Sequence, residues 1–357
     1  MSRQRLDPRT PLTELHVHLG AAVTPAIMWG IAHAQGIRLP TKDYWAFRDL
    51  ITVGRRRRSF DAYLDLFHWT ELIQSSPTAV ERSVYEVIGG AYRKNNITQL
   101  ELRFNPMKRN RGGEQDLDHI IAAALRGMDR AVLEYPHVRA GLIFCLDRGF
   151  SRDLNEILAA KAIAWQSRGV VGIDIAGPVT EGFRFADYTE VFAACRRAGL
   201  GLTVHAGETG GADEVRDAIE RLDPDRIGHG VRAADDPTVL AMLRERGTVL
   251  EVCPSSNLNT GVLANAGEVR RVVRGLVEHD VRFTISTDGP EMLRSYLRDE
   301  LQLLMRHEIL SLEEVERAIR IGSEASFLDR APTIESSVTG RDGVAGGRAS
   351  MPVGAGT

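Results

Sequence analysis

The sequence predicts an α/β protein of the (β/α)8, or TIM, barrel class, in which parallel strands alternate with helices. Three observations lead to this prediction. Short apolar and β-branched runs recur eight times along the 357 residues, amphipathic helical segments separate most of them, and polar residues end nearly every run. Buried parallel strands are near-continuously apolar, and such a barrel has its active site at the carboxyl ends of its strands. The polar strand ends therefore favour a barrel over a doubly wound sheet, which is the structural alternative.

The expected strands follow one another at intervals that leave room for helices. The segments 154–168 and 189–199 are two of these helices, and a further helical segment, 291–327, follows the last strand. Alternation of this kind is typical of a parallel sheet. In chain order the strands are TELHVHL (13–19), ITQLELRFNP (97–106), RAGLIFCLDR (139–148), GVVGIDIAGP (169–178), GLGLTVHAGE (199–208), RIGHG (226–230), GTVLEVCPSSN (247–257) and VRFTISTDGP (281–290).

The connection between the first two strands is unusually long. Residues 25–96 separate these strands and include the helical segment 76–94, so we expect a helical insertion that acts as a lid over the barrel mouth. The run GRRRRS within it holds four arginines, Arg55–Arg58. A run of like charges is usually a solvated loop, and a site for a substrate phosphate or carboxylate is the alternative.

Composition indicates one ordinary globular domain. We expect residues 1–333 to form a single barrel domain, and the Gly-, Ser- and Ala-rich segment 334–357 to be a disordered tail. Hydrophobic residues make up 43% of the chain and charged residues 26%, and the net charge is -3. These values indicate neither a nucleic-acid partner nor a membrane partner. The oligomeric state leaves no signal in this pattern.

The cysteines and the N-terminal segment point to the cytoplasm. Cys145, Cys195 and Cys253 are odd in number and lie in separate apolar stretches, a pattern typical of reduced thiols rather than of a disulfide framework. The start MSRQRLDPRT contains no apolar leader segment, and no run approaches the roughly 18 apolar residues of a membrane span. We therefore expect a cytoplasmic protein.

Five titratable side chains stand at expected strand ends. His16 and His18 are two residues apart in the first strand, so both point to the same face. His205, His229 and Asp288 end the fifth, sixth and eighth strands, which places them at the same rim. An isolated His-x-His pair is also common in protein cores, but imidazoles together with a carboxylate are a ligand set suited to Zn²⁺.

The residues beside this cluster suit acid–base chemistry. Glu208 lies three residues beyond His205 and can move protons between a metal-bound water and a leaving group. His229 can orient that water, and Asp288 can act as a metal ligand, as the acceptor of the water's proton, or as both in turn. A solvent-exposed loop acid at Glu208 and a structural turn at Asp288 are the alternatives.

The lysine and cysteine positions narrow the type of metal site. Lysines occur only at positions 42, 94, 108 and 161, and none ends an expected strand. A second metal bridged by a modified lysine is therefore disfavoured, and we expect one zinc ion per chain. The three cysteines cannot form the P-C-x-x-C pair of cytidine deaminase-like zinc sites.

The motifs in this order resemble those of the adenosine deaminase family of the amidohydrolase superfamily. The resemblance implies a zinc barrel that adds water at C6 of an adenine-type base and releases ammonia. The segment from residue 13 to residue 290 carries it, and 291–327 also fits. The matching stretches are ELHVHL, LELRFNP, GIDIAG, TVHAGE, RIGHG, EVCPSSN and STDGP.

The resemblance also implies roles for single residues. His16, His18, His205 and Asp288 correspond to the family's zinc ligands, and Glu208 corresponds to its proton donor. Other roles are a histidine that positions the attacking hydroxide, a glycine whose amide meets the purine, and two supports at a strand end. The residues at these positions are His229, Gly177, Ser255 and Asn257.

Three positions depart from the family pattern. The family's HLDG motif has an aspartate that meets the ribose 5′-hydroxyl, and this chain has Gly20 there. A second eighth-strand aspartate reads purine N7 in the family, and this chain has Gly289. Pro178 replaces the acid that normally follows the glycine of the fourth strand. The catalytic residues are thus retained, while the residues that recognise the substrate have changed.

These departures predict altered substrate choice. A lost hydrogen bond to the substrate costs roughly 1–3 kcal/mol, so we expect adenosine to be a poorer substrate here. Room at Gly20 and Ala21 would admit a bulkier 5′ substituent or a base without ribose, and loss of the N7 partner would suit a purine whose N7 is absent or modified.

Three functions are consistent with the residues. The first is a zinc aminohydrolase acting on an adenine-type nucleoside or derivative as its small-molecule partner. The second keeps the zinc site but hydrolyses a C–N bond in a different heterocycle or amide. The third is a catalytically inactive binding or regulatory protein on the same barrel, against which the intact His, Asp and Glu set argues.

Overall fold

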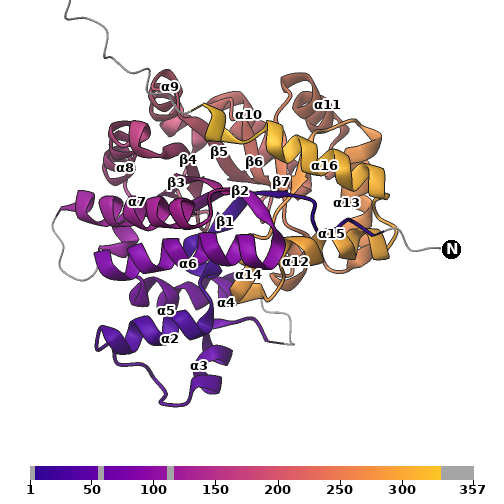
Figure 1. Cartoon of the computed structure of the whole chain (residues 1–357). Coiled ribbons are helices and arrows are strands. Elements are labelled where there is room, and N and C mark those ends of the chain that lie inside the picture. Colours follow the sequence, from indigo (N-terminus) through magenta and orange to yellow (C-terminus); the bar gives the residue numbers. More distant parts are fainter. Residues whose placement is uncertain (1–4, 55–59, 111–115, 331–357) are drawn as a thin grey trace, which may run out of the picture.

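The computed structural model describes residues 5–54, 60–110 and 116–330, and these residues form a parallel barrel (Figure 1). Every strand pairs in parallel with the next along the chain, and a bridge between Val17 and Asp288 connects the last strand to the first. The predicted barrel class is confirmed. The strands are β1 (Leu12–His18), β2 (Ile97–Phe104), β3 (Arg139–Asp147), β4 (Val170–Ala176), β5 (Gly201–Ala206), β6 (Arg226–His229), β7 (Val249–Val252) and β8 (Phe283–Ile285).

Helices surround the strands, and the apolar core lies between the two layers. Local signals set several helix starts. Ser76 caps α6 through the backbone N–H of Ala79, and Ser311 forms a capping box with Glu314 at the start of α16. The outer helices are α7 (Leu117–Glu134), α8 (Arg152–Ala164), α9 (Thr189–Arg197), α10 (Ala212–Leu222), α11 (Pro237–Arg246), α12 (Pro254–Asn259), α13 (Ala266–Glu278), α14 (Pro290–Leu293), α15 (Leu297–Arg306) and α16 (Leu312–Glu324).

Short 3-10 helices connect several of these elements. They occur after β2, before and after β4, after β6 and at the end of the described chain. Their bounds are η1 (Met107–Arg109), η2 (Gln166–Arg168), η3 (Phe185–Tyr188), η4 (Val231–Asp235) and η5 (Phe327–Asp329).

The expected helical insertion lies between β1 and β2. Its first part, drawn in indigo and violet, gathers beside the barrel at the bottom of Figure 1. The arginine run Arg55–Arg58 lies outside the described residues, as does the tail 334–357. After α1 (Leu19–Ala22), which directly follows β1, the helices of the insertion are α2 (Pro25–Ala34), α3 (Tyr44–Ile51), α4 (Phe60–Leu64), α5 (Leu66–Ile73) and α6 (Pro77–Asn95).

The three cysteine thiols are free. Cys145, Cys195 and Cys253 are all buried, and none forms a disulfide. Burial raises the pKa of Cys195 to about 12, which keeps that thiol protonated and unreactive at neutral pH.

Among the helices of the described segments, none combines the length and the apolar character needed to cross a membrane.

Candidate active site

Three of the residues predicted to bind a metal meet at the carboxyl ends of β1 and β5. One ring nitrogen from each of His16, His18 and His205 lies within 4.8 Å of the other two. The Nε2 atoms of His18 and His205 are 3.3 Å apart, and Asp288 Oδ1 lies 3.6 Å from His18 Nε2. The structure therefore brings together all four side chains that were predicted as metal ligands.

Backbone contacts between the last and first strands fix Asp288 against the histidines. Its backbone N–H donates to the carbonyl of His16 at 2.8 Å, and its own carbonyl accepts from the N–H of His18 at 2.9 Å. Asp288 and His229 have left-handed backbones, with φ of 64° and 62°. Residues other than glycine adopt this conformation at a cost of about 1 kcal/mol or more, and it is common at functional sites.

Two buried carboxylates orient the histidines. His16 Nδ1 lies 2.7 Å from Glu251 Oε2, and His205 Nδ1 lies 2.9 Å from Asp174 Oδ2. Each contact leaves the Nε2 atom of the ring to face the cluster, and His16 Nε2 is buried without a hydrogen-bond partner. An orphaned buried nitrogen of this kind is satisfied by a metal ion, so the residues present fit a metal site.

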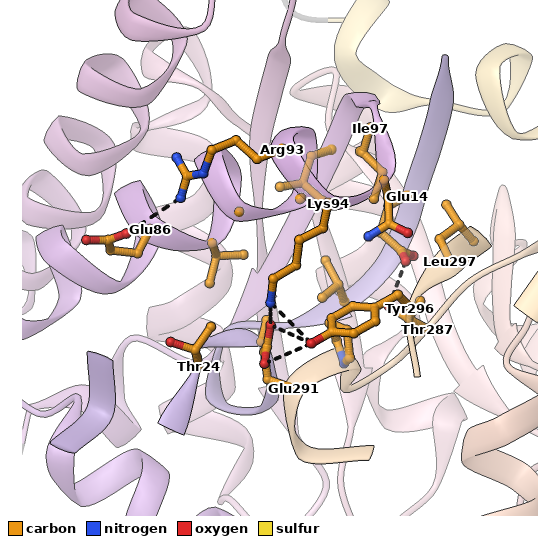
Figure 2. A pocket seen from close by; sticks show the side chains of 18 of the residues that line it. Glu14, Thr24, Glu86, Arg93, Lys94, Ile97, Thr287, Glu291, Tyr296 and Leu297 are labelled. Atoms are coloured by element: carbon orange, nitrogen blue, oxygen red, sulfur yellow. Dashed lines mark hydrogen bonds and ion pairs between the residues drawn. The ribbon is translucent and has the colours of Figure 1, made fainter. Parts of the chain in front are cut away.

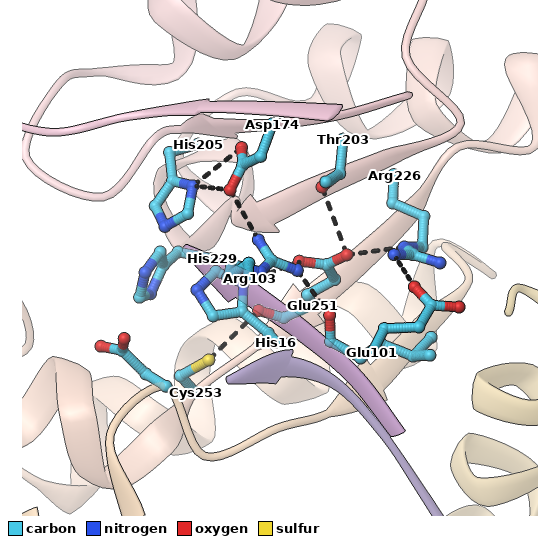
Figure 3. Close-up of polar contacts among 12 residues, drawn as sticks. His16, Glu101, Arg103, Asp174, Thr203, His205, Arg226, His229, Glu251 and Cys253 are labelled. Atoms are coloured by element: carbon cyan, nitrogen blue, oxygen red, sulfur yellow. Dashed lines mark hydrogen bonds and ion pairs between the residues drawn. The ribbon is translucent and has the colours of Figure 1, made fainter. Parts of the chain in front are cut away.

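Two arginines beneath the cluster balance the charge of these acids (Figure 3). Arg103 lies 2.9 Å from Asp174 and 2.8 Å from Glu251, and Arg226 lies 2.6 Å from Glu251 and 2.5 Å from Glu101. All five side chains are fully buried, where charges are tolerated only when paired. The network fixes the acids in position next to the histidine cluster.

The pKa of Asp174 follows from this pairing. Burial by itself would raise the pKa of this carboxyl, but His205 and Arg103 outweigh burial and hold it well below its usual value. The sequence prediction missed Asp174, Glu251 and Arg103. Charged residues inside the apolar strands GIDIAG, EVCP and LELRF are the signal that could have revealed them.

Glu208 and His229 form a second pair beside the cluster. Glu208 Oε1 lies 3.6 Å from His229 Nε2. Burial and the nearby Asp288 raise the pKa of Glu208 well above its usual value, while burial and the neighbouring His205 lower the pKa of His229 to about 3. His229 is therefore neutral at neutral pH, while the raised pKa of Glu208 favours its protonated form. This is the arrangement of a general acid beside a neutral imidazole.

The polypeptide that follows β7 supports His229 and Asp288. The side-chain amide of Asn257 donates to His229 Nδ1 at 3.1 Å, as expected for a positioning residue. Ser255 faces Glu300, to which its backbone N–H donates at 3.1 Å. The contact with the site comes instead from Ser256, which the sequence prediction missed: its hydroxyl donates to Asp288 Oδ2 at 2.6 Å.

The space expected at Gly20 is filled. A Cβ at this position would lie 2.9 Å from Phe67 Cδ1 and 3.0 Å from Arg109 Nη2, and Ala21 is also buried. The expectation that Gly20 and Ala21 leave room for a bulkier 5′ substituent is therefore wrong. An aromatic side chain from α5 has taken that volume.

Gly289 is enclosed in the same way. A Cβ here would lie 2.8 Å from Ala21 Cβ and 3.0 Å from the hydroxyl oxygen of Tyr63. Tyr63 is buried and its hydroxyl lies 3.4 Å from Asp288 Oδ2. Gly177 differs from the other two glycines because it lines the open cavity, with φ of 97°.

A cavity of about 540 Å³ opens above the cluster. Strand ends form one side of it and the insertion forms the other, so that a ligand would lie between the catalytic groups and an aromatic wall. The lining residues are His18, Phe60, Tyr63, Leu64, Phe67, Arg148, Ala176, Gly177, His205, Ala206, Glu208, Thr209, Glu214, His229 and Asp288.

A larger cavity, of about 870 Å³, lies against α6 and α15 (Figure 2). Its charged groups are paired with one another, since Lys94 contacts Glu291 and donates to Tyr296 at 3.2 Å. Glu14 accepts a hydrogen bond from Thr287 at 2.7 Å. Among its described lining residues there is no histidine. The cavity at the strand ends is therefore the candidate active site.

Comparisons with known proteins agree with this geometry. The adenosine deaminase family model matches residues 11–336. An adenosine deaminase of Clostridium kluyveri is 30% identical over 330 residues, which cover 92% of this chain and 93% of that protein. Among solved structures, an adenine deaminase of Arthrobacter aurescens has a TM-score of 0.77 at 20% identity, covering 90% of this chain and 98% of that chain. A zinc-bound amidohydrolase of Burkholderia ambifaria has a TM-score of 0.76 at 23% identity, covering 90% and 86% respectively.

Proposed function

The chain belongs to the adenosine deaminase family, and from this premise we propose that it is a zinc-dependent aminohydrolase. Its substrate is an adenine-type purine nucleoside or derivative. Water adds at C6 of the purine, the amino group leaves as ammonia, and a carbonyl replaces it. The observation that carries this proposal is that a histidine cluster able to hold a metal ion and a largely buried Glu208 with a raised pKa lie at one cavity.

One zinc ion per chain fits the cluster. His16, His18, His205 and Asp288 would hold it, because each offers an imidazole nitrogen or a carboxylate oxygen at the same point. Zinc bound at such a site lowers the pKa of a coordinated water to about 7 and makes a nucleophile available at neutral pH. The amidohydrolase of the same fold from Burkholderia ambifaria was solved with zinc.

The remaining groups divide the proton transfers. Asp288 takes the proton that the attacking water loses and passes it to the leaving amino group, and Glu208 gives its own proton to the substrate as the C6 centre becomes tetrahedral. Glu208 regains a proton from the C6 hydroxyl as the carbonyl forms and ammonia leaves. Neutral His229, held by Asn257, donates a hydrogen bond to the attacking oxygen. The backbone N–H of Gly177 contacts the purine ring from β4. Nothing in this scheme requires a nucleic-acid or membrane partner, and a cytoplasmic enzyme fits it.

A panel of substrates tests the proposal. Zinc-loaded protein is incubated with adenine, adenosine, 5′-modified adenosines and 7-deaza analogues, and ammonia release and the ultraviolet shift of the purine are both measured. We expect ammonia and the shift to appear together for at least one member, with about one zinc per chain by elemental analysis. Ammonia released only from other heterocycles would instead support the same site acting on a different C–N bond. No zinc and no ammonia would overturn the proposal.

A further inference from the structure

Tyr63 is a residue of the insertion that contacts one of the proposed metal ligands directly. It lies on α4, only 3% exposed, and its hydroxyl is 3.4 Å from Asp288 Oδ2. Tyr63 and Thr209 carry the hydroxyl groups among the described lining residues, and Thr209 is exposed. Tyr63 therefore supplies the one buried hydroxyl that faces the cavity in the described part of the chain.

The hydroxyl of Tyr63 and the missing side chain at Gly289 depend on each other. Any side chain at position 289 would begin 3.0 Å from that hydroxyl and 2.8 Å from Ala21 Cβ, closer than carbon atoms pack. The residue after Asp288 must be glycine for Tyr63 to stand where it does. A polar group is thus present at the place where the family pattern has a carboxyl, but it arrives from α4.

Packing fixes the direction of this hydroxyl. The ring of Tyr63 meets the ring of Phe67 edge to face, with centroids 5.6 Å apart, and Phe67 in turn fills the space beside Gly20. Apolar contacts therefore hold the phenol ring in one orientation. They do not use the hydroxyl proton, which can be donated to a polar acceptor.

The phenol's proton is available to a ligand. Its contact with Asp288 is long for an O–H···O bond, whose usual distance is about 2.7 Å. The same carboxylate oxygen already accepts from Ser256 at 2.6 Å. A phenol is a donor that needs no unusual protonation state at neutral pH. A ligand with an sp² nitrogen beside the reacting carbon, placed at normal hydrogen-bond distance from the hydroxyl, can accept this proton in place of the distant Asp288 oxygen.

Resting on the proposed function, we propose that Tyr63 is a specificity-determining residue that donates a hydrogen bond to N7 of the purine. In a purine, N7 lies on the same edge as the C6 amino group. A purine whose C6 faces Glu208 and Asp288 therefore presents N7 to this wall of the cavity. The site selects purines that keep N7, contrary to the expectation drawn from Gly289 in the sequence.

Tyr63→Phe tests the proposal because it removes the hydroxyl and keeps the ring. For each enzyme, kcat/KM is measured for the preferred purine of the panel and for its 7-deaza analogue, which has a C–H in place of N7. The wild type should prefer the N7 purine by roughly tenfold or more. Tyr63→Phe should lose about that factor on the N7 purine alone, so that its preference falls to about one.

Tyr85→Phe is the matched control. Tyr85 lies on α6, where its hydroxyl contacts Glu134 away from this cavity, and its loss should leave the N7 preference unchanged. Zinc content is measured for all three proteins to show that the cluster is intact. An equal loss on both substrates, or an unchanged preference in Tyr63→Phe, would overturn the role of Tyr63 while leaving the proposed function standing.

A binding measurement separates failure of the two proposals. The Kd values of hypoxanthine and 7-deazahypoxanthine, measured by calorimetry on zinc-loaded protein, need no turnover. If the wild type deaminates no purine but binds hypoxanthine more tightly than its 7-deaza analogue, and Tyr63→Phe abolishes the difference, Tyr63 keeps its role and the deaminase proposal fails. If the wild type neither deaminates nor binds any purine, both proposals fail.

Discussion

The strand side and the insertion side of the cavity are built by different means. On the strand side, His16 and His205 each have a buried carboxylate partner, and Arg103 ties the two carboxylates together. On the insertion side, Tyr63 and Phe67 are held mainly by aromatic packing. The proposed metal-binding histidines are thus fixed by strand register and ion pairs. The groups that would choose the substrate belong to the short helices α4 and α5 of the insertion.

Removing the acid on the strand side should have the largest effect. Glu208→Gln keeps the size of the side chain but cannot give and recover a proton, so we expect kcat to fall roughly 10²- to 10⁴-fold. Zinc content should stay unchanged, because Glu208 is not among the residues proposed to hold the metal. Steady-state kinetics and elemental analysis measure the two quantities, with the exposed loop acid Glu181→Gln as the control. A variant that kept full kcat would remove Glu208 from the mechanism.

The partner acids should control metal affinity without touching the metal. Asp174→Asn weakens the contact that orients His205, and we expect zinc to bind roughly 10- to 100-fold more weakly. Competition with a coloured chelator measures the affinity. Asp147→Asn is a close control, because Asp147 ends the neighbouring strand but pairs with Lys108 instead of a histidine. Equal affinities in the two variants would contradict the role given to Asp174.

Crowding the insertion side should cost stability. In Gly289→Ala the new Cβ meets Ala21 and Tyr63, and overpacking of this kind typically lowers the free energy of unfolding by roughly 1–3 kcal/mol. Adding Ala21→Gly should recover part of the loss. Urea denaturation compares these proteins with Gly90→Ala, whose Cβ would enter open space. If Gly289→Ala were as stable as the wild type, the side chains around Gly289 would be packed less tightly than their distances indicate.

Mild acid should destabilise the metal-free strand side. Burial and His205 lower the folded-state pKa of His229 from 6.5 to about 3, so below pH 6.5 the unfolded chain binds a proton that the folded protein does not. Stability is complete above this pH and falls as the pH drops towards the folded pKa. By pH 6 the loss from His229 is roughly 1 kcal/mol.

Urea denaturation of chelator-treated protein between pH 8 and pH 5 measures this dependence. His16 and His18, whose pKa values burial also lowers, add losses of the same sign. His229→Asn should therefore show a shallower fall than the wild type, without becoming flat. Parallel curves for the two proteins would show that His229 is not held neutral by the fold.

The sequence predicted the strand side well because its geometry is periodic. Residues two apart on a strand share a face, and parallel strands end at one rim, so His16, His18, His205 and Asp288 could be grouped from their positions alone. The buried partners were also accessible in principle, as charged residues in apolar strands.

The insertion side could not be predicted in this way. Gly20 and Gly289 indicated only that two side chains were missing, and a missing side chain says nothing about which neighbour takes its volume. Phe67 and Tyr63 fill these spaces through the packing of α4 and α5, which depends on contacts far apart in the chain. Tertiary packing therefore decided whether the positions beside the two glycines are open or filled, and aromatic side chains fill them.

The backbone bridge that closes the barrel also joins two parts of the proposed metal site. β8 is three residues long, and the carbonyl of His16 and the amide of His18 bind the backbone of Asp288 just beyond it. The proposed metal ligands therefore lie on both sides of the junction between the first and last strands, and a bound metal would hold these strands together. Metal bound there would favour the closed ring over any form with that seam open. Because Asp288 is synthesised some 270 residues after His18, the complete set of metal ligands would come together only after the barrel has closed.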